Sequence, residues 1–258
     1  MITFTIITCT FNAQSVAKRT FRSVLRQTYR GVEHLIIDGA STDDTLAMVR
    51  NYQYANDKER TGHTIKITSE KDQGLYFAMN KGLKQAQNDY IVFLNAGDTF
   101  PSGDTLDRIS LSVGEREDLP GVLYGDTDIV DNDGNFLRHR RLCPPEHLSW
   151  RSFKWGMLVC HQSFYALTKI ARDIPYNTNY HYSADVDWCI RIMQECEKEG
   201  LKLRNVHGVV THYLAEGLTT KNHKASLKER FRVMKKHYGL LITLWVHLCF
   251  AFRAFYKH

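Results

Sequence analysis

Four short apolar runs alternate with helical patterns through the first hundred residues of the chain. The runs cover residues 3–8, 34–37, 64–68 and 90–94. The intervals between them carry apolar residues at helical spacing, and one interval opens with a capping cluster at residues 41–44. The order β-α-β-α-β-α-β predicts an α/β fold, in which a Rossmann-like, mostly parallel sheet is flanked by helices.

The length and composition are compatible with this fold. A chain of 258 residues suffices for one large α/β domain or two small ones. Hydrophobic residues make up 43% and charged residues 24%, so a sizeable core can form and wholesale disorder is excluded.

Neither the first residues nor the cysteines indicate secretion. Residues 1–7 lack the basic start of a signal peptide, and we expect a first core strand there. The six cysteines form no Cys-x-x-Cys pair and no zinc-ligand spacing. We expect reduced, buried thiols in a cytosolic protein, with disulfides as the alternative.

The second half of the chain is less regular. Residues 121–130 and 135–141 flank an Asp-Asn-Asp-Gly turn, which predicts a β-hairpin. A helix is expected to begin after Ser183, and residues 203–213 are a further strand candidate.

Each of the four early strands is followed by a polar cluster. The clusters cover residues 8–12, 38–43, 69–74 and 95–98. The carboxyl ends of parallel strands meet at one edge of a sheet, where open α/β proteins bind ligands, so we expect these loops to lie together. Their carboxylates suit a divalent cation with an anionic ligand. For any one loop a structural alternative stays open: a turn at Asp38, a helix cap at Asp43 and Asp44, or a solvated acid at Asp98.

The ordered combination of these loops resembles family 2 glycosyltransferases, which have the GT-A fold. The resemblance is carried by residues 8–12, 36–45, 69–82 and 93–98. It is strong over residues 3–100 and looser over 120–220, and it is nearest to bacterial members that build capsule, exopolysaccharide or O-antigen units. It implies an enzyme of hexosyltransferase type that moves a sugar, with inversion, from a nucleotide-diphosphate donor, usually with Mg²⁺ or Mn²⁺ as cofactor.

The resemblance also implies roles for individual residues of the first half. Those implied to bind the nucleotide-sugar are Thr8, Phe11, Asp38, Glu70, Asp72 and Asn95. Asp98 matches the last acid of the family's Asp-x-Asp-type motif and would bind the metal. That motif reads Asn-Ala-Gly-Asp here, so only one of its usual carboxylates remains, although the pyrophosphate supplies further oxygen ligands. Phe77 stands where many relatives have an acid.

The general base is expected from the second half. Inversion needs a carboxylate that takes the proton of the acceptor hydroxyl as its oxygen attacks the anomeric carbon. Residues 183–188 resemble the family's base motif at a helix start, and Asp185, rather than Asp187, matches the catalytic position. The alternative is that both acids only interact with the helix dipole, a contribution of about 0.3–1 kcal/mol each.

Several other side chains are weaker candidates. Those for acceptor binding are His161, Gln162, Asp187 and Trp188, and His212 is a candidate for the metal or the diphosphate. Trp150, Trp155 and Trp188 could stack on a sugar ring, but core packing explains each of them equally well.

The net charge of +6 is unevenly distributed. Residues 221–258, called here the basic tail, hold nine Lys and Arg against one acid, Glu229, a local charge of +8. The other 220 residues carry 25 basic and 27 acidic groups. This distribution argues against a nucleic-acid surface, which more often spreads its positive charge over the folded body.

The basic tail is expected to form two helices, at about 222–237 and 239–256. The first is basic and amphipathic, which suits an anionic membrane surface, and the second is apolar but shorter than the roughly 20 residues that span a bilayer. We therefore predict a monotopic anchor at the inner membrane face. Packing on the catalytic domain or on a second subunit, as in a homodimer, is the alternative.

These observations predict a glycosyltransferase domain at residues 1–220 followed by the basic tail. Its nucleotide-sugar-binding half would be residues 1–100 and its acceptor-binding half residues 101–220. The acceptor would be a glycan or a polyprenyl-diphosphate-linked sugar. A sugar nucleotidyltransferase is one alternative, although residues 8–13 contain no glycine for a phosphate loop. A non-catalytic nucleotide-sugar-binding homologue is the other.

Overall fold

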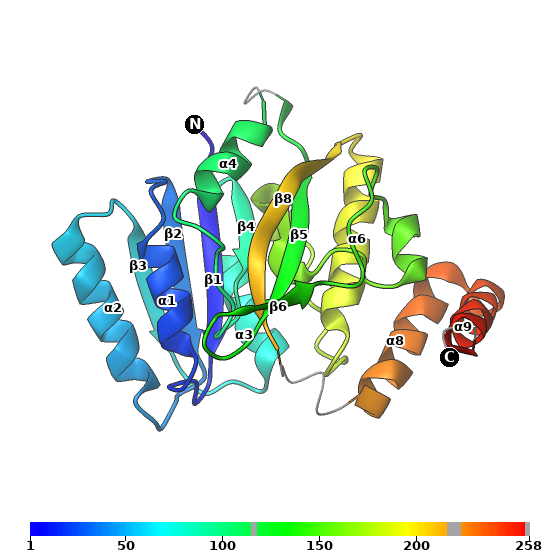
Figure 1. Cartoon of the computed structure of the whole chain (residues 1–258), viewed down its shortest axis with the longest axis horizontal. Helices are drawn as coiled ribbons and strands as arrows, with labels where there is room; N and C mark the ends of the chain where they lie inside the picture. Colours follow the sequence, from blue (N-terminus) through cyan, green and yellow to red (C-terminus); the bar gives the residue numbers. More distant parts are fainter. Residues whose placement is uncertain (115–117, 216–222, 256–258) are drawn as a thin grey trace.

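The computed structural model describes residues 1–114, 118–215 and 223–255 (Figure 1). Its strands are β1 (Phe4–Thr10), β2 (Val32–Asp38), β3 (Thr64–Ser69), β4 (Tyr90–Phe93), β5 (Val122–Val130), β6 (Phe136–His139), β7 (Phe164–Leu167) and β8 (Leu203–Leu214). Its helices are α1 (Ala17–Leu25), α2 (Thr45–Glu59), α3 (Leu75–Gln85), α4 (Thr105–Ser112), α5 (Thr168–Ala171), α6 (Ala184–Lys198), α8 (His223–Tyr238) and α9 (Leu240–Phe255), with 3₁₀ turns η2 (Trp150–Trp155) and η3 (His161–Ser163).

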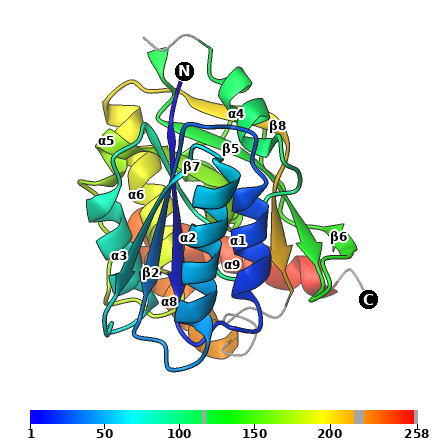
Figure 2. The same cartoon turned by 90° about the vertical axis from the view of Figure 1, so that its left-hand side faces the viewer.

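The strands form one mixed sheet in the order β3-β2-β1-β4-β7-β5-β6, and β8 pairs with β5. The strands β1 to β4 are parallel, as the alternating pattern predicts. Figure 2 shows α1 on one face of the sheet and α3 on the other. Helices on both faces explain why all seven residues of β1 are buried and why the strand reads as a continuous apolar run. The α/β fold class is therefore confirmed.

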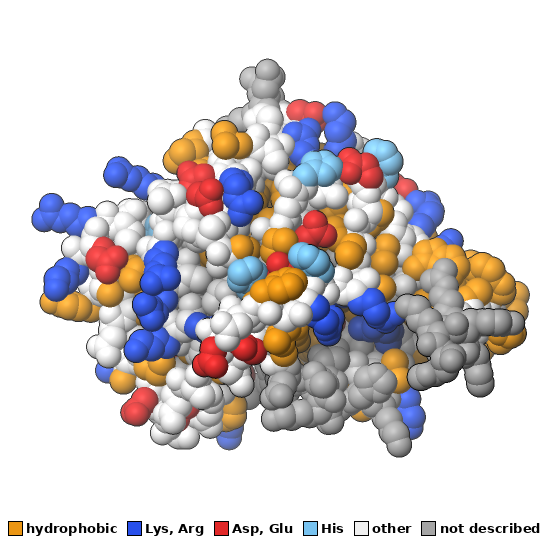
Figure 3. All heavy atoms as spheres, viewed as in Figure 1, with side chains coloured by type: hydrophobic (Ala, Val, Ile, Leu, Met, Phe, Trp, Pro, Cys, Tyr) orange, Lys and Arg blue, Asp and Glu red, His pale blue; other side chains and the backbone are white. Residues whose placement is uncertain are grey.

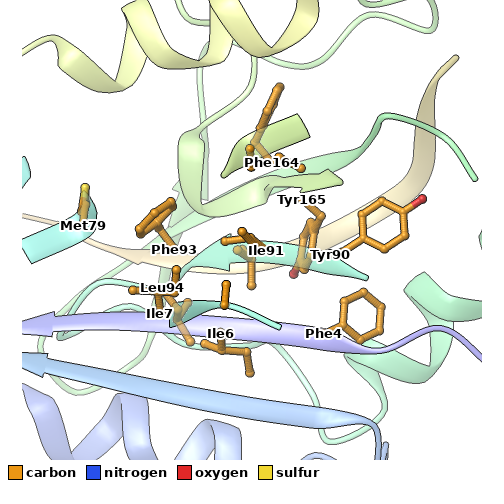
Figure 4. Packing of buried hydrophobic residues seen from close by; sticks show 14 of the residues in the cluster. Phe4, Ile6, Ile7, Met79, Tyr90, Ile91, Phe93, Leu94, Phe164 and Tyr165 are labelled. Carbon is orange, nitrogen blue, oxygen red and sulfur yellow. The ribbon is translucent and has the colours of Figure 1, made fainter. Parts of the chain in front are cut away.

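The core lies between the central strands and the helices that cover them. Figure 4 shows Ile6 and Ile7 of β1 packed beside Ile91 of β4. On the α3 side the fit is close, because a Cβ added to Gly82 would lie 2.5 Å from Cγ2 of Ile7. Glycine lets α3 lie directly on the sheet at this point.

The predicted hairpin, the helix after Ser183 and the strand near residue 203 are all present, as β5–β6, α6 and β8. The short strand β7 is not predicted by the pattern, and it lies antiparallel between β4 and β5. Its four residues are all buried and therefore show no polar alternation, which leaves too short a signal to mark a strand.

The two tail helices are present as α8 and α9, although residues 221, 222 and 256–258 of the basic tail lie outside the described residues. Helix α8 packs against α6, where Asp187 accepts hydrogen bonds from Lys236 (3.0 Å) and His237 (2.8 Å). No helix within residues 1–114, 118–215 and 223–255 is long and apolar enough to cross a membrane.

Candidate active site at the carboxyl ends of the strands

The ends of β1, β2 and β3 lie side by side, because Asp38 is the register partner of both Thr10 and Ser69. The Asp38 carboxylate accepts hydrogen bonds from the hydroxyls of Thr10 (2.9 Å), Ser69 (2.8 Å) and Ser41 (2.5 Å). It also accepts one from the backbone N–H of Ser41 at 2.9 Å. Asp38 thus joins the three strand ends through its own side chain.

The Asp38 carboxyl is charged within the protein. Burial alone would raise its pKa, but the hydrogen bonds from Ser41, Ser69 and Thr10 outweigh burial and hold the pKa below its ordinary value. The side chain is fully buried. All of the hydrogen bonds of the Asp38 side chain are made within the protein, so this carboxylate holds the strand ends together rather than facing an open site.

The loops after β1 and β2 are tied together by backbone hydrogen bonds to side chains. The N–H of Asn12 donates to Ser41 Oγ (2.9 Å), and Asn12 Oδ1 accepts from the N–H of Thr42 (2.9 Å). The N–H of Ala13 donates to Thr45 Oγ1 at 2.8 Å. Asn12 has a φ of 47°, a left-handed conformation that asparagine tolerates better than most residues. These contacts hold the two loops as one unit.

Phe11, Gly39 and Asp72 come together beside this unit. A Cβ added to Gly39 would lie 3.3 Å from the Phe11 ring and 3.7 Å from Asp72 Oδ2. The Phe11 ring is 66% exposed, which leaves a flat apolar surface free beside a polar edge. Thr8, by contrast, faces inward, where its hydroxyl donates to the Leu94 carbonyl at 2.7 Å.

Lys81 of α3 joins the two acids predicted after β3. Its ammonium lies 2.7 Å from Glu70 and 2.5 Å from Asp72. The hydrogen bonds to Asp72 and Glu70 raise the pKa of Lys81. Sequence reasoning did not assign Lys81 a role, although it lies two helical turns after the loop that carries both acids and therefore faces back toward it.

Asp98, the predicted metal ligand, is 3% exposed. Its Oδ2 accepts from the Gln162 amide (2.8 Å), and its Oδ1 accepts from the N–H of Leu214 (2.9 Å). Burial raises the pKa of Asp98 to about 6, and these two hydrogen bonds only partly offset that effect. Gln162, predicted on the acceptor side, thus contacts the metal candidate instead.

Sequence alone could not join these segments, which are 64 and 116 residues apart. The end of β8 reaches Asp98 because Thr99 and His212 pair through their backbones. The His212 ring is half-buried, and burial lowers its pKa.

Asp98 is the one carboxylate that the structure offers to a divalent cation at this point of the described residues. No group of three or more His, Cys, Asp or Glu side chains converges on one point in residues 1–114, 118–215 and 223–255. A carboxylate has about four acceptor positions, and Asp98 uses two of them for the hydrogen bonds from Gln162 and Leu214. Asp98 therefore fits a cation that one carboxylate and the phosphates of a nucleotide hold together.

A chain of polar contacts runs from the donor loops to the predicted base. Asn95 Nδ2 lies 3.2 Å from His161 Nε2, and His161 Nδ1 lies 3.4 Å from Asp185 Oδ2. If Asn95 donates to Nε2, the ring proton lies on Nδ1 and faces Asp185. The Asp185 side chain is 19% exposed, so a ligand can still reach it.

Asp185 is held in its charged form. Burial would raise its pKa, but the hydrogen bond and charge of His161, the charge of Arg230 and the N–H of Val186 keep the pKa below its ordinary value. The Asp185 carboxylate is therefore deprotonated at neutral pH and partly exposed, which a proton acceptor requires.

The remaining acceptor candidates lie within the protein. Asp187 is fully buried and pairs with Arg191, Lys236 and His237. Trp188 is also fully buried, stacked 4.8 Å from the ring of Tyr176. Although Asp187 and Trp188 closely follow Asp185 in the sequence, neither side chain is exposed as that of Asp185 is.

Two other tryptophans make ring contacts with the basic tail. Trp150 stacks on Tyr238 at 5.7 Å, and Trp155 meets Trp245 edge-on at 5.6 Å. These contacts join η2 to α8 and α9.

A mostly parallel sheet, with polar loops at one edge and a mixed second half, is the GT-A fold expected from the sequence. The profile described as "Glycosyl transferase family 2" matches residues 5–170. The chain therefore belongs to glycosyl transferase family 2 and is a glycosyltransferase.

Two curated relatives are similar over most of the chain. A PGL/p-HBAD biosynthesis glycosyltransferase of Mycobacterium bovis is 33% identical over 81% of this chain and 76% of its own length. The amylovoran biosynthesis glycosyltransferase AmsB of Erwinia amylovora is 28% identical over 82% of this chain and 69% of its own length.

Two solved structures share the fold. Residues 1–349 of S. aureus TarS, in complex with UDP-GlcNAc, superpose with a TM-score of 0.70 at 16% identity, covering 91% of this chain and 65% of that one. The mannosyltransferase PcManGT of Pyrobaculum calidifontis, with GDP-Man and Mn²⁺, gives 0.62 at 16% identity, covering 91% and 64%. This chain thus spans just under two thirds of these solved chains.

Replacement of Asp38 by Asn should destabilise the protein at neutral pH. One oxygen becomes an NH₂ group that cannot accept, so buried donors lose their partner, at a cost of about 1–3 kcal/mol. Because the folded-state pKa is lowered, the wild-type advantage is complete above the ordinary carboxyl pKa of about 4 and shrinks as the pH falls below it.

Urea unfolding of wild type and Asp38→Asn across this pH range measures the difference. Asp44→Asn is the matched control, because Asp44 is exposed and its side chain makes no capping hydrogen bond. Equal stability of Asp38→Asn and wild type at neutral pH would contradict the structural role of Asp38.

Proposed function

We propose that the protein transfers a sugar, with inversion, from a nucleotide-diphosphate donor to a hydroxyl of a glycan or lipid-linked acceptor in bacterial surface polysaccharide or glycolipid synthesis. The observation that carries the proposal is the Asn95–His161–Asp185 contact chain, which joins the donor loops to a charged carboxylate. The relatives act in PGL/p-HBAD biosynthesis and in amylovoran biosynthesis, which supports this kind of product.

The donor would lie at the carboxyl ends of β1 to β4. The exposed Phe11 ring offers a stacking surface to the base, and Asp72 lies beside it, bound to Lys81. Asp38 keeps these loops in place through its four hydrogen bonds. Lys81 holds both Asp72 and Glu70 at the same edge.

Asp185 would act as the general base. It would take the proton of the acceptor hydroxyl while that oxygen forms a bond to the anomeric carbon, and the bond from that carbon to the phosphate oxygen would break. The nucleotide diphosphate then leaves with the bonding electrons. His161 orients Asp185, since its Nδ1 faces the carboxylate at 3.4 Å.

Asp98 would hold a divalent cation together with the donor diphosphate. When bound, such a cation neutralises the charge that develops on the leaving phosphate. Burial of Asp98 raises its pKa to about 6. In such a buried environment a nearby positive charge stabilises the charged carboxylate most strongly. Gln162 contacts the Asp98 carboxylate, and Asn95 contacts His161.

The basic tail would rest on an anionic membrane surface at the inner face of the cell membrane. The exposed apolar residues of α9 are Leu240, Leu241, Ile242, Leu244, Trp245, Leu248 and Phe252. Thr243 and Val246 are fully buried on the opposite side. Figure 3 shows hydrophobic side chains gathered at the end of the molecule where Figure 1 places α9.

The charges beside this face favour lipid as its occupant. Lys228, Arg232 and Lys235 of α8 are exposed, and the one acid of the tail, Glu229, is bound to backbone amides. Apolar area and several cations together suit anionic headgroups, at roughly 1 kcal/mol per cation near the surface. The division between the domain at residues 1–220 and the tail stays a prediction.

A panel of nucleotide sugars, including UDP-GlcNAc and GDP-mannose, tests the reaction. We expect wild type to hydrolyse or transfer from at least one of them, and Asp185→Asn to be slower by roughly 10²–10⁴-fold because the base is gone. Lys202→Ala, at an exposed ion pair with Asp118, is the control. An Asp185→Asn variant as fast as wild type would rule out Asp185 as the base.

Metal dependence is tested by titrating the product nucleotide diphosphate into the protein. Wild type should bind it more tightly with Mn²⁺ than without, and Asp98→Asn should lose most of that gain because the protein carboxylate is replaced by an amide. Isothermal titration calorimetry measures both. Binding that ignores Mn²⁺ in wild type contradicts the metal assignment and favours a non-catalytic homologue.

Membrane binding is tested with the full chain and two point substitutions. Leu241→Glu with Leu248→Glu should reduce co-sedimentation with phosphatidylglycerol liposomes, because two exposed apolar contacts become anionic. Leu111→Glu on α4 is the control, since Leu111 is 82% exposed and Leu241 83%. If the double variant instead turns a dimer into a monomer and leaves liposome binding unchanged, α9 binds a second copy.

A further inference from the structure

The one acid of the basic tail contacts the backbone that directly precedes α6. Glu229 of α8 accepts hydrogen bonds from three successive backbone N–H groups, those of His181 (2.9 and 3.0 Å), Tyr182 (2.7 Å) and Ser183 (3.2 Å). These amides lie directly before α6, whose second residue is Asp185. Glu229 of α8 therefore binds the backbone directly before α6, including the N–H of the N-cap residue Ser183.

This contact is suited to fix the start of α6. Among the three amides, only that of Ser183 belongs to the helix end, as the N–H of the N-cap residue without a partner within α6. The helix dipole favours a negative charge at this end. The side chain of Ser183, at the N-cap position, makes no capping hydrogen bond and donates to the Ser226 carbonyl of α8 instead (3.3 Å). Hydrogen bonds to a carboxylate are also stronger than neutral ones.

A second contact holds α6 to α8 just after Asp185. Asp187 Oδ1 accepts from Lys236 and His237, at 3.0 and 2.8 Å. Asp185 thus lies between two attachment points, both made by α8. The charge of Arg230, next to Glu229 in the sequence, also lowers the pKa of Asp185.

We propose that Glu229 is a positioning residue for the acceptor side of the reaction. It acts through the backbone of residues 181–183 on the direction of the Asp185 carboxylate, so that part of the basic tail completes the active site. This inference rests on the proposed role of Asp185 as the base.

The expected size of the effect follows from the geometry. Without an anion at residues 181–183, three amides lose a charged partner, and the start of α6 can shift. Asp185 lies 3.4 Å from His161, so a small shift separates them. A misplacement of about 1 Å at a reacting group costs roughly 10²-fold in rate.

The test compares Glu229→Ala with wild type in hydrolysis of the nucleotide sugar that wild type turns over in the panel above, with water as acceptor. We expect kcat to fall by roughly 10–10²-fold while the KM for the donor changes little, because the donor loops lie on other elements. Acetate should restore part of the lost kcat by occupying the three amides, and hydrogen exchange of residues 181–183 should slow when it binds. Acetate should not restore Asp185→Asn.

Lys235→Ala is the matched control, since Lys235 is an exposed residue of the same helix with no assigned contact to α6. If Glu229→Ala does not fold, Glu229→Gln, which keeps the shape and loses the charge, is measured by the same criteria. A wild-type kcat in the variant, or an equal loss of donor binding and kcat without acetate rescue, overturns the inference. If wild type turns over no nucleotide sugar, the proposed function fails instead, and hydrogen exchange with and without acetate still tests the contact of Glu229 with residues 181–183.

Discussion

The parallel pairing of β1 with β2 on one side and β4 on the other is the constraint on which the site depends. Parallel strands in register end at the same edge of the sheet. The loops that follow them therefore lie together as a consequence of the strand pairing alone. Asp38 then fixes that edge chemically, because its carboxylate joins the ends of β1, β2 and β3. These contacts hold the ends of β1, β2 and β3 together.

The features that sequence could predict are local or follow from this pairing. The strands and helices of the first hundred residues, the hairpin at residues 131–134 and the start of α6 after Ser183 each have a signal within a few residues. The convergence of four loops needs only the parallel order of the strands. For Asp185 the sequence offered a family resemblance and a position at a helix start, and its contact with His161 required the structure.

The remaining contacts could not be predicted because they join distant segments through single side chains. Gln162 binds Asp98 only because η3 lies beside the end of β4, and η3 is placed there by β7, a strand too short to show a pattern. Thr8 shows the converse: it belongs to a motif of the resemblance, but it lies within β1, and its hydroxyl donates to the buried Leu94 carbonyl. Proximity to a motif in sequence does not determine where a side chain points.

The basic side chains of the tail fall into two groups with different surroundings. Lys236 and His237 donate hydrogen bonds to the buried Asp187 carboxylate, while Lys228, Arg232 and Lys235 are exposed. Glu229 interrupts the basic run of α8 where this helix contacts residues 181–183. A positive side chain at that position would lie unfavourably close to the N-terminus of α6. A surface that only had to attract anionic lipid would not need this acid, so its place is explained by α6. The same helix therefore links the surface proposed to face lipid to the carboxylate proposed to accept the proton.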